Sequence, residues 1–237
     1  MNLLLLQAEN MLSENRAEIS GRQVQHIHKT LNIETGNQLT VGLLNKQIGR
    51  ATIVDLQQDS AQLEIEWISA PPEALPLTLI IGLPRPKMLK RIIQTATTMG
   101  VKDLYFINAW KVEKSFWQSP WLSDEKLFGN CILGLEQAKD TVLPKIHLRK
   151  LFKPFVEDEL AAISEGSLKL LAHPITEQAC PANIKTQTTL IIGPEGGFTP
   201  YEVSKLEEVG FETVHLGARI LRVETAVPVL LGRLFQS

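Results

Sequence analysis

Short apolar runs separated by polar turns fill residues 1–72, a pattern typical of β-strands. The dipeptides Gly36-Asn37 and Asn45-Lys46 form turns between such runs. One helical turn is expected at His26–Leu31. The pattern predicts a small β-barrel or curled sheet with strands at Leu3–Leu6, Leu39–Leu44, Ile48–Leu56 and Ala61–Trp67.

The pattern changes after Pro71-Pro72, a proline pair that marks a connector. From residue 73 onward, apolar runs alternate with segments of helical periodicity. This alternation predicts an α/β domain at 73–237, with a mostly parallel sheet covered by helices on both faces, after a β domain at 1–72. Its strands are predicted at Leu77–Leu83, Leu104–Ile107, Ile146–Leu148, Leu168–Ala172, Leu190–Ile192 and Thr213–Leu216. Its helices are predicted at Pro86–Thr98, Glu125–Ala138, Lys153–Ile163, Tyr201–Val209 and Ala226–Phe235.

The stretch 190–200 combines a buried strand, a glycine-rich turn and a helix start. Thr199 lies three residues before Glu202, which predicts a capping box, and Pro200 occupies the first helical position. Gly210 is expected to end the helix in the left-handed conformation. Because ligands bind at the carboxyl ends of parallel strands, the turn is a candidate binding site.

The turn itself reads Gly193-Pro194-Glu195-Gly196-Gly197. Gly196 and Gly197 carry no side chain, so a ligand can approach the main chain there. A phosphate loop is a rival interpretation. Against it, the spacing of the phosphate-loop motifs is absent and Glu195 would repel a phosphate. A tight turn without any ligand is the second alternative.

Two further predicted strands also end in loops that could carry chemistry. The loop at 216–226 precedes a predicted helix with Thr225 as a candidate N-cap, and it holds Arg219, Arg222 and Glu224. Its charges could instead pair with one another in a solvated loop. His173 follows the other strand, where a hydrogen-bonded turn residue is a plainer interpretation than a catalyst. Three such loops at one sheet edge predict a pocket.

Composition narrows the class of protein. The 237 residues are 44% apolar and 21% charged, as in soluble globular proteins. A net charge of −2 gives no overall attraction to nucleic acid or membranes, so any basic surface must be local. Cys131 and Cys180 have no spacing typical of a disulfide framework or a zinc site, and no apolar run is long enough to span a membrane. We expect a cytoplasmic protein that uses neither a metal nor a membrane.

Three segments together resemble, in order and spacing, the S-adenosylmethionine-binding loops of the SPOUT methyltransferases. They are Leu171-Ala172-His173-Pro174, the run 190–198 and the run 216–226. Glu136-Gln137-Ala138 and the segment from Gln94 to Val101 resemble further family segments. Within this superfamily, residues 77–235 are most similar to the ribosomal small subunit methyltransferase E family, whose members methylate N3 of a uridine in small-subunit ribosomal RNA.

The resemblance implies a SPOUT-type domain with a C-terminal trefoil knot, an N-terminal PUA-like β-barrel that binds RNA, and a homodimer. It also implies S-adenosyl-L-methionine as cofactor and N3 of a specific uridine in small-subunit (16S) ribosomal RNA as methyl acceptor. Arg222 and Glu224 would be the catalytic residues. The cofactor would be held by backbone contacts and apolar cover from Leu171, His173, Gly193, Glu195, Gly196, Gly197, Leu216, Gly217, Ile220, Leu221 and Thr225.

The implied reaction gives the charged residues distinct roles. Uridine N3 must lose its proton before it can attack a sulfonium methyl group. Arg222 suits the stabilisation of negative charge that spreads onto the uracil oxygens. Glu224 could accept the proton or orient Arg222, and orientation is the favoured interpretation. The base must also leave its stack or lie in unpaired RNA to reach the pocket.

RNA binding is expected from local basic charge on the helix at Pro86–Thr98. One face of this helix would present Arg85, Lys87, Lys90 and Arg91 to RNA phosphates, beside Gln94. A solvated helix face is the alternative. The side chains of Trp110, Trp117 and Trp121 could stack on bases, although packing in the core or in a dimer interface is favoured for them.

Three segments depart from the family pattern at its presumed RNA contacts. Lys139-Asp140-Thr141-Val142 stands where the family carries arginines, Asn32 stands where a segment usually ends in arginine, and 108–111 replaces a Ser-Glu-Arg-like segment. These departures favour a changed substrate. The alternatives are therefore a methyltransferase of the same fold for another RNA site and a non-catalytic RNA-binding or cofactor-sensing relative. Arg222 together with Glu224 favours an active enzyme.

Overall fold

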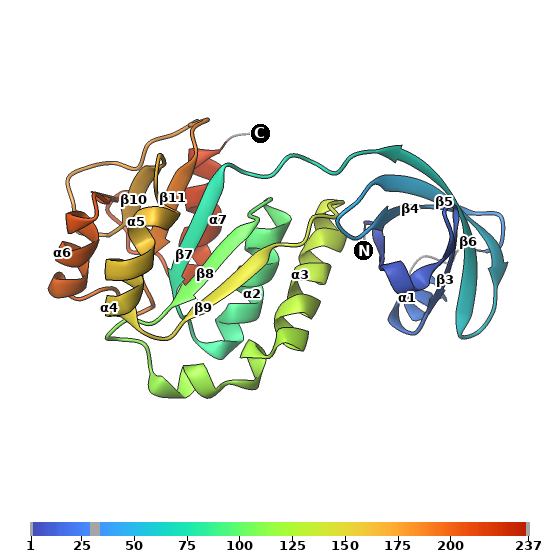
Figure 1. The fold of residues 1–237 in the computed structure, drawn as a ribbon, viewed down its shortest axis with the longest axis horizontal. Coiled ribbons are helices and arrows are strands. Elements are labelled where there is room, and N and C mark those ends of the chain that lie inside the picture. Colours follow the sequence, from blue (N-terminus) through green and yellow to red (C-terminus); the bar gives the residue numbers. More distant parts are fainter. Residues whose placement is uncertain (1, 29–33, 236–237) are drawn as a thin grey trace. The chain divides into compact units, whose positions relative to one another are not determined.

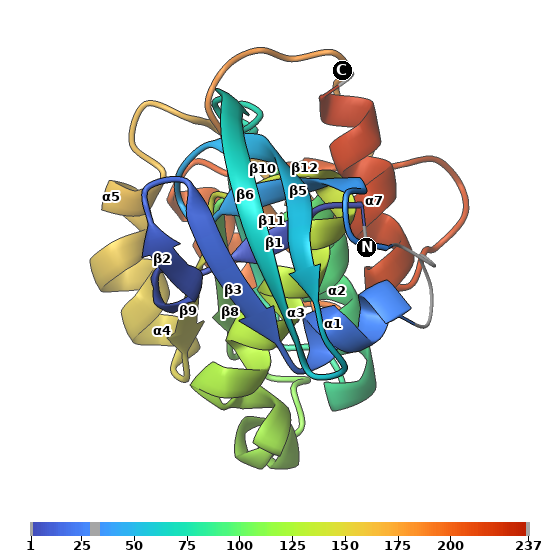
Figure 2. The same ribbon diagram turned by 90° about the vertical axis from the view of Figure 1, so that its right-hand side faces the viewer.

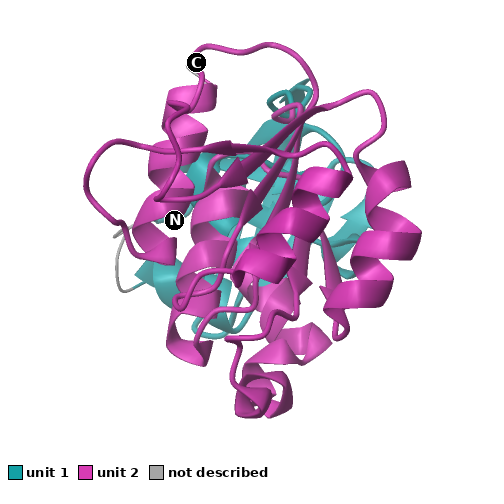
Figure 3. Ribbon diagram, turned by 90° about the vertical axis from the view of Figure 1, so that its left-hand side faces the viewer, with its two compact units in different colours: residues 1–73, 132–143 teal, residues 74–131, 144–237 magenta. Residues whose placement is uncertain are grey.

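The computed structural model of the chain describes residues 2–28 and 34–235 (Figure 1). The chain divides into two compact units, residues 1–73 with 132–143 and residues 74–131 with 144–237 (Figure 3). The division crosses helix α3 (Asp124–Ala138), whose residues from Ile132 onward are grouped with the first unit. The sequence pattern gave no reason to separate residues 132–143 from their neighbours, because this grouping depends on tertiary contacts.

A curled six-stranded sheet, in the order β1-β4-β5-β6-β3-β2, forms the first unit (Figure 2). β1 and β4 pair in parallel, and all the other neighbouring strands are antiparallel. The four predicted strands are present, but β2 and β3 were missed. The elements are β1 (Leu4–Leu6), η1 (Ala8–Asn10), β2 (Met11–Ser13), β3 (Arg16–Ser20), α1 (Arg22–His26), β4 (Gln38–Leu43), β5 (Ile48–Leu56) and β6 (Ser60–Ser69).

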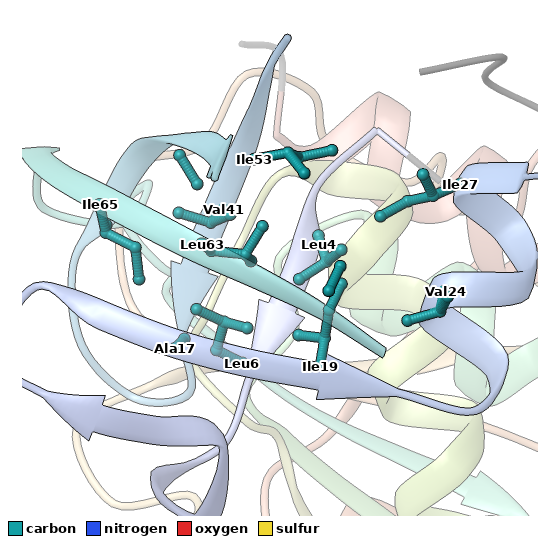
Figure 4. Packing of buried hydrophobic residues seen from close by; sticks show 12 residues of the cluster. Leu4, Leu6, Ala17, Ile19, Val24, Ile27, Val41, Ile53, Leu63 and Ile65 are labelled. Atoms are coloured by element: carbon teal, nitrogen blue, oxygen red, sulfur yellow. The ribbon is translucent and has the colours of Figure 1, made fainter. Parts of the chain in front are cut away.

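Alternate residues of these strands point into one apolar core (Figure 4). In β3, for example, Ala17 and Ile19 are buried while the three residues around them are exposed. This period of two is that of a half-buried strand, although only two apolar residues carry it in β3, too few for the sequence pattern to reveal it. The core consists of Leu4, Leu6, Ala17, Ile19, Val24, Ile27, Val41, Ala51, Ile53, Ala61, Leu63 and Ile65.

A bidentate ion pair joins α1 to the end of α3 inside the first unit. Arg22 Nη1 and Nη2 donate to the two carboxylate oxygens of Glu136 at 2.9 and 2.8 Å. Glu136 is only 2% exposed, so the arginine compensates a carboxylate that water cannot reach. The segment that resembles the family at Glu136 therefore has a structural contact here. Of the helical turn predicted at His26–Leu31, residues 29–31 lie outside the described residues.

The second unit contains a six-stranded sheet in which every pairing is parallel, in the order β12-β10-β11-β7-β8-β9. Figures 1 and 2 show α2 and α7 on one face of this sheet and α4 and α5 on the other, as the alternating pattern predicted. Its strands are β7 (Leu77–Gly82), β8 (Asp103–Ile107), β9 (Lys145–Arg149), β10 (Leu168–Ala172), β11 (Thr188–Ile192) and β12 (Glu212–Val214). Its helical elements, besides the first part of α3, are α2 (Pro86–Thr98), η3 (Lys114–Gln118), η4 (Pro120–Leu122), α4 (Phe152–Pro154), η5 (Phe155–Glu159), α5 (Leu160–Ile163), α6 (Pro200–Glu208) and α7 (Val223–Leu234).

Three predicted elements differ from the observed ones. The helix expected at Lys153–Ile163 is divided into α4, a π-helical turn and α5. The strand expected at Thr213–Leu216 ends at Val214. Helix α7 begins at Val223, three residues earlier than expected, because Glu224 and Thr225 interrupt the apolar periodicity between Val223 and the rest of the helix. None of the described helices could cross a membrane, as each is too short or too polar.

Candidate functional site

The carboxyl ends of β10, β11 and β12 lie at the same edge of the second sheet. Ala172 is in register with Ile192 of β11 and with Val214 of β12, so the three following loops start at one level. These loops surround a cavity of about 490 Å³, a size typical of small-molecule sites. The sequence predicted that they would meet, and the structure confirms it.

The loop at 193–199, which follows β11, is fixed by hydrogen bonds from two other strand ends. Glu195 Oε1 accepts the backbone N–H of Arg85 at 2.9 Å, just after β7. Lys111 Nζ donates to the carbonyl oxygen of Gly196 at 2.8 Å, from the segment after β8. Within the loop, Gly197 N–H donates to Pro194 O at 2.7 Å, with Gly197 in the left-handed region at φ +70°. The loop therefore has little freedom to move.

Glu202 secures the far end of this loop. Its Oε2 accepts the backbone N–H and the hydroxyl of Thr199 at 2.8 and 2.9 Å, and Thr199 Oγ1 accepts Glu202 N–H in return. This is the capping box that the sequence predicted, and Gly210 ends the helix at φ +96° as expected. Glu202 Oε1 also accepts the backbone N–H of Trp110 at 2.7 Å. Since Glu202 is 4% exposed, these three donors replace its hydration.

Gly82, the last residue of β7, allows the 193–199 loop to lie directly against that strand. A Cβ atom at Gly82 would lie 2.6 Å from the backbone nitrogen of Pro194, which is closer than real Cβ contacts come. Any larger residue at 82 would have to displace the loop. The absence of a side chain at this position thus sets the position of one wall of the cavity.

The loop at 215–222, which follows β12, is held mainly at its first residue. His215 N–H donates to Gln178 O, and His215 O accepts the backbone N–H of Cys180, both at 2.9 Å. Gly217, at φ +111°, donates its backbone N–H to His215 Nδ1 at 2.8 Å. Within the described part of the chain, the backbone N–H groups of Leu216, Ile220 and Leu221 donate no hydrogen bond. The Ile220 side chain lines the cavity although it is 80% exposed. This wall therefore offers free main-chain donors and apolar surface to a ligand.

The third loop carries His173 into the cavity lining. Its backbone N–H donates to Val214 O at 2.9 Å, and its Nδ1 lies 3.2 Å from the backbone nitrogen and 3.0 Å from the carbonyl oxygen of Ile175. The hydrogen-bonded turn residue expected from the sequence is therefore present, and the same residue contributes to the cavity wall.

Most of the predicted cofactor-binding positions and one of the two predicted catalytic residues line the cavity: His173, Gly193, Glu195, Gly196, Gly197, Leu216, Gly217, Ile220, Leu221 and Arg222. Leu171 is instead fully buried within β10. Glu224 and Thr225 lie in the first turn of α7 and are not among the lining residues. The prediction that Thr225 is the N-cap of this helix was wrong, because the N-cap is Arg222.

The predicted pair Arg222 and Glu224 makes no contact with each other. Among the described residues, no ion pair or hydrogen bond joins them, although two positions separate them in sequence. Arg222 thus keeps its guanidinium available at the cavity. Glu224 lies where a carboxylate is favoured by the helix dipole, in the first turn of α7.

Lys111 is a charged lining residue outside the three loops that the sequence reasoning missed as a site residue. It follows β8, which is separated from β11 by β7 alone. The signal that could have found it is the strand order, since the ends of adjacent parallel strands share an edge. The cavity lining carries charges of both signs and is mainly positive, since it includes Lys111, Arg219 and Arg222 beside Glu195. No cluster of His, Cys, Asp and Glu that could hold a metal ion occurs among the described residues.

The predicted basic face of α2 is exposed on the second unit. Arg85, Lys87, Lys90 and Arg91 all face solvent, while Leu89, Ile92, Ile93 and Ala96 are buried. Lys90 Nζ lies 5.6 Å from the ring centre of Trp121, close enough for a cation–π contact. Gln94 is occupied, since its amide donates to Asn130 Oδ1 at 2.8 Å.

Two of the three family departures have structural contacts. Asp140 is 3% exposed and its Oδ1 accepts the backbone N–H of Val142 at 2.9 Å, so its carboxylate does not face a substrate. In the segment 108–111, Asn108 accepts the indole N–H of Trp117, while Trp110 and Lys111 hold the 193–199 loop as described above. Asn32 lies outside the described residues.

Comparisons with known proteins agree with the motifs. Residues 71–235 match the RNA methyltransferase domain family. Ribosomal RNA small subunit methyltransferase E of Treponema pallidum (strain Nichols) is 28% identical over 233 residues, covering 95% of this chain and 87% of the relative. The protein of the same name from Bacillus subtilis (strain 168) is 27% identical over 220 residues, covering 88% and 85%.

The fold also matches solved structures. A ribosomal RNA small subunit methyltransferase E from Neisseria gonorrhoeae, crystallised bound to S-adenosyl methionine, aligns with a TM-score of 0.76. The alignment covers 98% of this chain and 96% of the Neisseria gonorrhoeae chain, at 20% sequence identity. The comparison therefore supports the fold. The resemblance found in the sequence is confirmed, and the chain belongs to the RNA methyltransferase domain family.

Proposed function

We propose that this RNA methyltransferase transfers the methyl group of S-adenosyl-L-methionine to N3 of a uridine in small-subunit ribosomal RNA. The observation that carries the proposal is the single cavity formed by the three loops after β10, β11 and β12, with Arg222 in its lining. The relatives named ribosomal RNA small subunit methyltransferase E, which align over most of this chain, supply the class of substrate. The cytoplasm, where ribosomes are assembled and modified, is the proposed place of action.

The cavity fits the proposed cofactor in size and chemistry. Leu216, Ile220 and Leu221 offer apolar side chains for an adenine ring and unused backbone N–H groups for its ring nitrogens. The positive φ of Gly217 and the absence of a side chain at Gly197 leave the main chain open to a ligand there, whereas the side chain of Lys111 covers Gly196. Glu195 adds a negative charge near a molecule whose sulfonium is positive.

When bound, the cofactor supplies an electrophilic methyl group on a sulfonium. The bond from uridine N3 to the methyl carbon forms as the carbon–sulfur bond breaks, and the N3 proton passes to a base. Arg222 would donate hydrogen bonds to the uracil oxygens and stabilise the negative charge that develops when N3 is deprotonated. The structure offers no contact by which Glu224 would orient Arg222, so we assign Glu224 only to the first turn of α7, where its charge favours that helix end.

RNA would be held by basic charge near this edge of the sheet. Arg85, Lys87, Lys90 and Arg91 are exposed and can neutralise several phosphates, which makes binding salt-dependent. The target base would enter the cavity from an unpaired segment or after leaving its stack. We assign the curled sheet of the first unit to a PUA-like RNA-binding domain, in line with the family resemblance.

We also propose the trefoil knot and the homodimer that the resemblance implies. Contacts between the connection 173–187 and the end of α7 support the knot. Asn183 and Ile184 donate their backbone N–H groups to the carbonyls of Arg233 and Leu234, and Arg233 Nε donates to Cys180 O. The connection joins two adjacent parallel strands without a helix, and these hydrogen bonds hold it against the last turn of α7. Sedimentation velocity would test the dimer.

The test is transfer of labelled methyl from S-adenosylmethionine to small ribosomal subunits that lack N3-methyluridine, followed by mapping of the modified nucleotide. Label on N3 of one uridine is the expected result. Label at another atom or in another RNA would favour the second candidate, a methyltransferase for a different RNA site, which Asn32 at an expected arginine position favours. Cofactor binding without any transfer would contradict an active enzyme.

A further inference from the structure

Trp110 differs from the two tryptophans that follow it in sequence. Trp110 is 84% exposed. Within the described residues, its indole makes no hydrogen bond or ring contact. Trp117 is half-buried and donates its indole N–H to Asn108 Oδ1 at 2.8 Å. Trp121 is 37% exposed and lies beneath the amine of Lys90. The sequence interpretation favoured packing in the core or in a dimer interface, and its first half is wrong for Trp110.

The backbone beneath this exposed indole is fixed. Ala109 and Val112 are buried on either side, and Val112 N–H donates to Ala109 O at 3.0 Å to close a turn. Trp110 N–H donates to the buried carboxylate of Glu202 at 2.7 Å. A large aromatic surface is thus presented to solvent on a turn that cannot easily withdraw it.

The turn also lies beside the cavity. Lys111, the next residue, lines the cavity and its amine reaches Gly196 O at 2.8 Å. That partner is a carbonyl oxygen and not a carboxylate. Lys114 is exposed further along, with Glu113 between the two lysines. An aromatic face next to cationic side chains is the combination that holds a base together with its phosphate.

We propose that Trp110 stacks on a base of the RNA substrate at the rim of the cavity and so positions the nucleotide that enters it. This inference rests on the proposed function, because the cavity must be the methylation site for the stack to position a substrate. Trp110 acts here by contact with the RNA and takes no part in the methyl transfer itself. A stacking contact is tolerant of base identity, so the proposal concerns affinity and placement rather than sequence recognition.

The test uses the full chain and a single-stranded RNA oligonucleotide of mixed sequence, so it does not depend on methyl transfer. Trp110→Ala is expected to weaken RNA binding by about 5- to 100-fold, the range for loss of one base–aromatic stack. Trp110→Phe should keep most of the affinity, since a smaller aromatic face remains. The salt dependence should be unchanged in both variants, because no phosphate contact is lost. Binding of S-adenosylmethionine, measured by calorimetry, should be unchanged and would show that the cavity is intact.

Tyr201→Ala is the matched control, since Tyr201 is a 55% exposed aromatic residue of α6 outside the cavity lining. Its RNA affinity should equal that of the unaltered chain. Three outcomes would overturn the proposal: unchanged RNA affinity in Trp110→Ala, equal losses in Trp110→Ala and Tyr201→Ala, or dissociation of a dimer by Trp110→Ala in sedimentation. The last would assign Trp110 to an interface with a second copy. If Trp110→Ala weakens RNA binding but the unaltered chain methylates no uridine in ribosomal RNA, the stacking contact stands and only the proposed reaction is rejected.

Discussion

The two principal walls of the cavity are built in opposite ways. The loop at 193–199 is held by Glu195, Lys111 and Glu202 through hydrogen bonds to three separate segments of the chain. In the loop at 215–222, His215 exchanges backbone hydrogen bonds with Gln178 and Cys180 and accepts the N–H of Gly217 at its Nδ1, whereas the N–H groups at 216, 220 and 221 are unused within the described residues. One wall is preformed by the protein, whereas the other is left for a ligand to complete.

This difference suggests how binding and catalysis are divided. A preformed wall loses little conformational entropy when a ligand binds. A loop with free donors gains its hydrogen bonds only when the ligand arrives. Arg222 lies at the end of the second loop, as the N-cap of α7. Ordering of that loop by the cofactor would therefore also fix the guanidinium that meets the uracil. Changes in the two walls should have different consequences.

The largest effect is expected from Arg222→Ala, in the adaptable wall. Single-turnover methyl transfer at saturating cofactor should slow by about 100- to 1,000-fold, the usual cost of losing a group that stabilises developing charge. The dissociation constant of S-adenosylmethionine, measured by calorimetry, should change by less than about threefold, which is about half of the roughly 1.4 kcal/mol that a tenfold change represents. Arg219→Ala, at the other arginine of the same loop, is the matched control and should slow transfer far less. Equal losses of turnover and cofactor affinity in Arg222→Ala would contradict the assigned role.

Glu202→Ala should destabilise the preformed wall. The change leaves the N–H groups of Trp110 and Thr199 without their acceptor in a buried site, which should cost about 2–4 kcal/mol in the free energy of unfolding. Urea denaturation would measure it, and cofactor affinity should fall with it. Glu208→Ala removes an exposed carboxylate paired with Lys205 on the same helix and should cost under about 1 kcal/mol. Similar values for the two variants would show that Glu202 does not secure the loop.

Gly82→Ala tests the same wall from the neighbouring strand. Its Cβ would overlap the backbone nitrogen of Pro194, so the loop must shift at a cost of about 1–3 kcal/mol, with weaker cofactor binding. Gly129→Ala is the control: its Cβ would meet no atom within 4 Å, and alanine favours helix α3 by up to about 1 kcal/mol. Thermal denaturation of the two variants should give melting-temperature shifts of opposite sign. Undisturbed cofactor binding in a folded Gly82→Ala would mean that this wall does not need its observed position.

The same division separates what the sequence could predict from what it could not. The capping box of Thr199 and Glu202 and the left-handed Gly210 are local signals, and the structure has both. The contacts of Glu202 with Trp110 and of Lys111 with Gly196 join positions 92 and 85 residues apart, for which no local pattern exists. The sequence could therefore predict the loop at 193–199 but not the long-range hydrogen bonds that hold it in place.

Burial accounts for two other differences. Asp140 was interpreted as a changed RNA contact because an acidic residue replaces the family's arginines, but its carboxylate accepts a backbone N–H inside the first unit. Trp110 was expected to pack in the core or in a dimer interface, but it is exposed on a turn whose flanking residues Ala109 and Val112 are buried instead. In both cases the type of residue is known from the sequence, but its burial depends on parts of the chain that are distant in sequence.

Hydrogen exchange with and without S-adenosylmethionine would test the central claim, that these loops bind the cofactor, most directly. On addition of the cofactor, the amides of Leu216, Ile220 and Leu221 should exchange at least about tenfold more slowly, as free N–H groups gain partners. The amides of Gly197 and Thr199, which already donate hydrogen bonds, should be protected beforehand and change little. Binding of the cofactor with unchanged exchange at 216–221, or with protection only in residues 1–73, would contradict the claim.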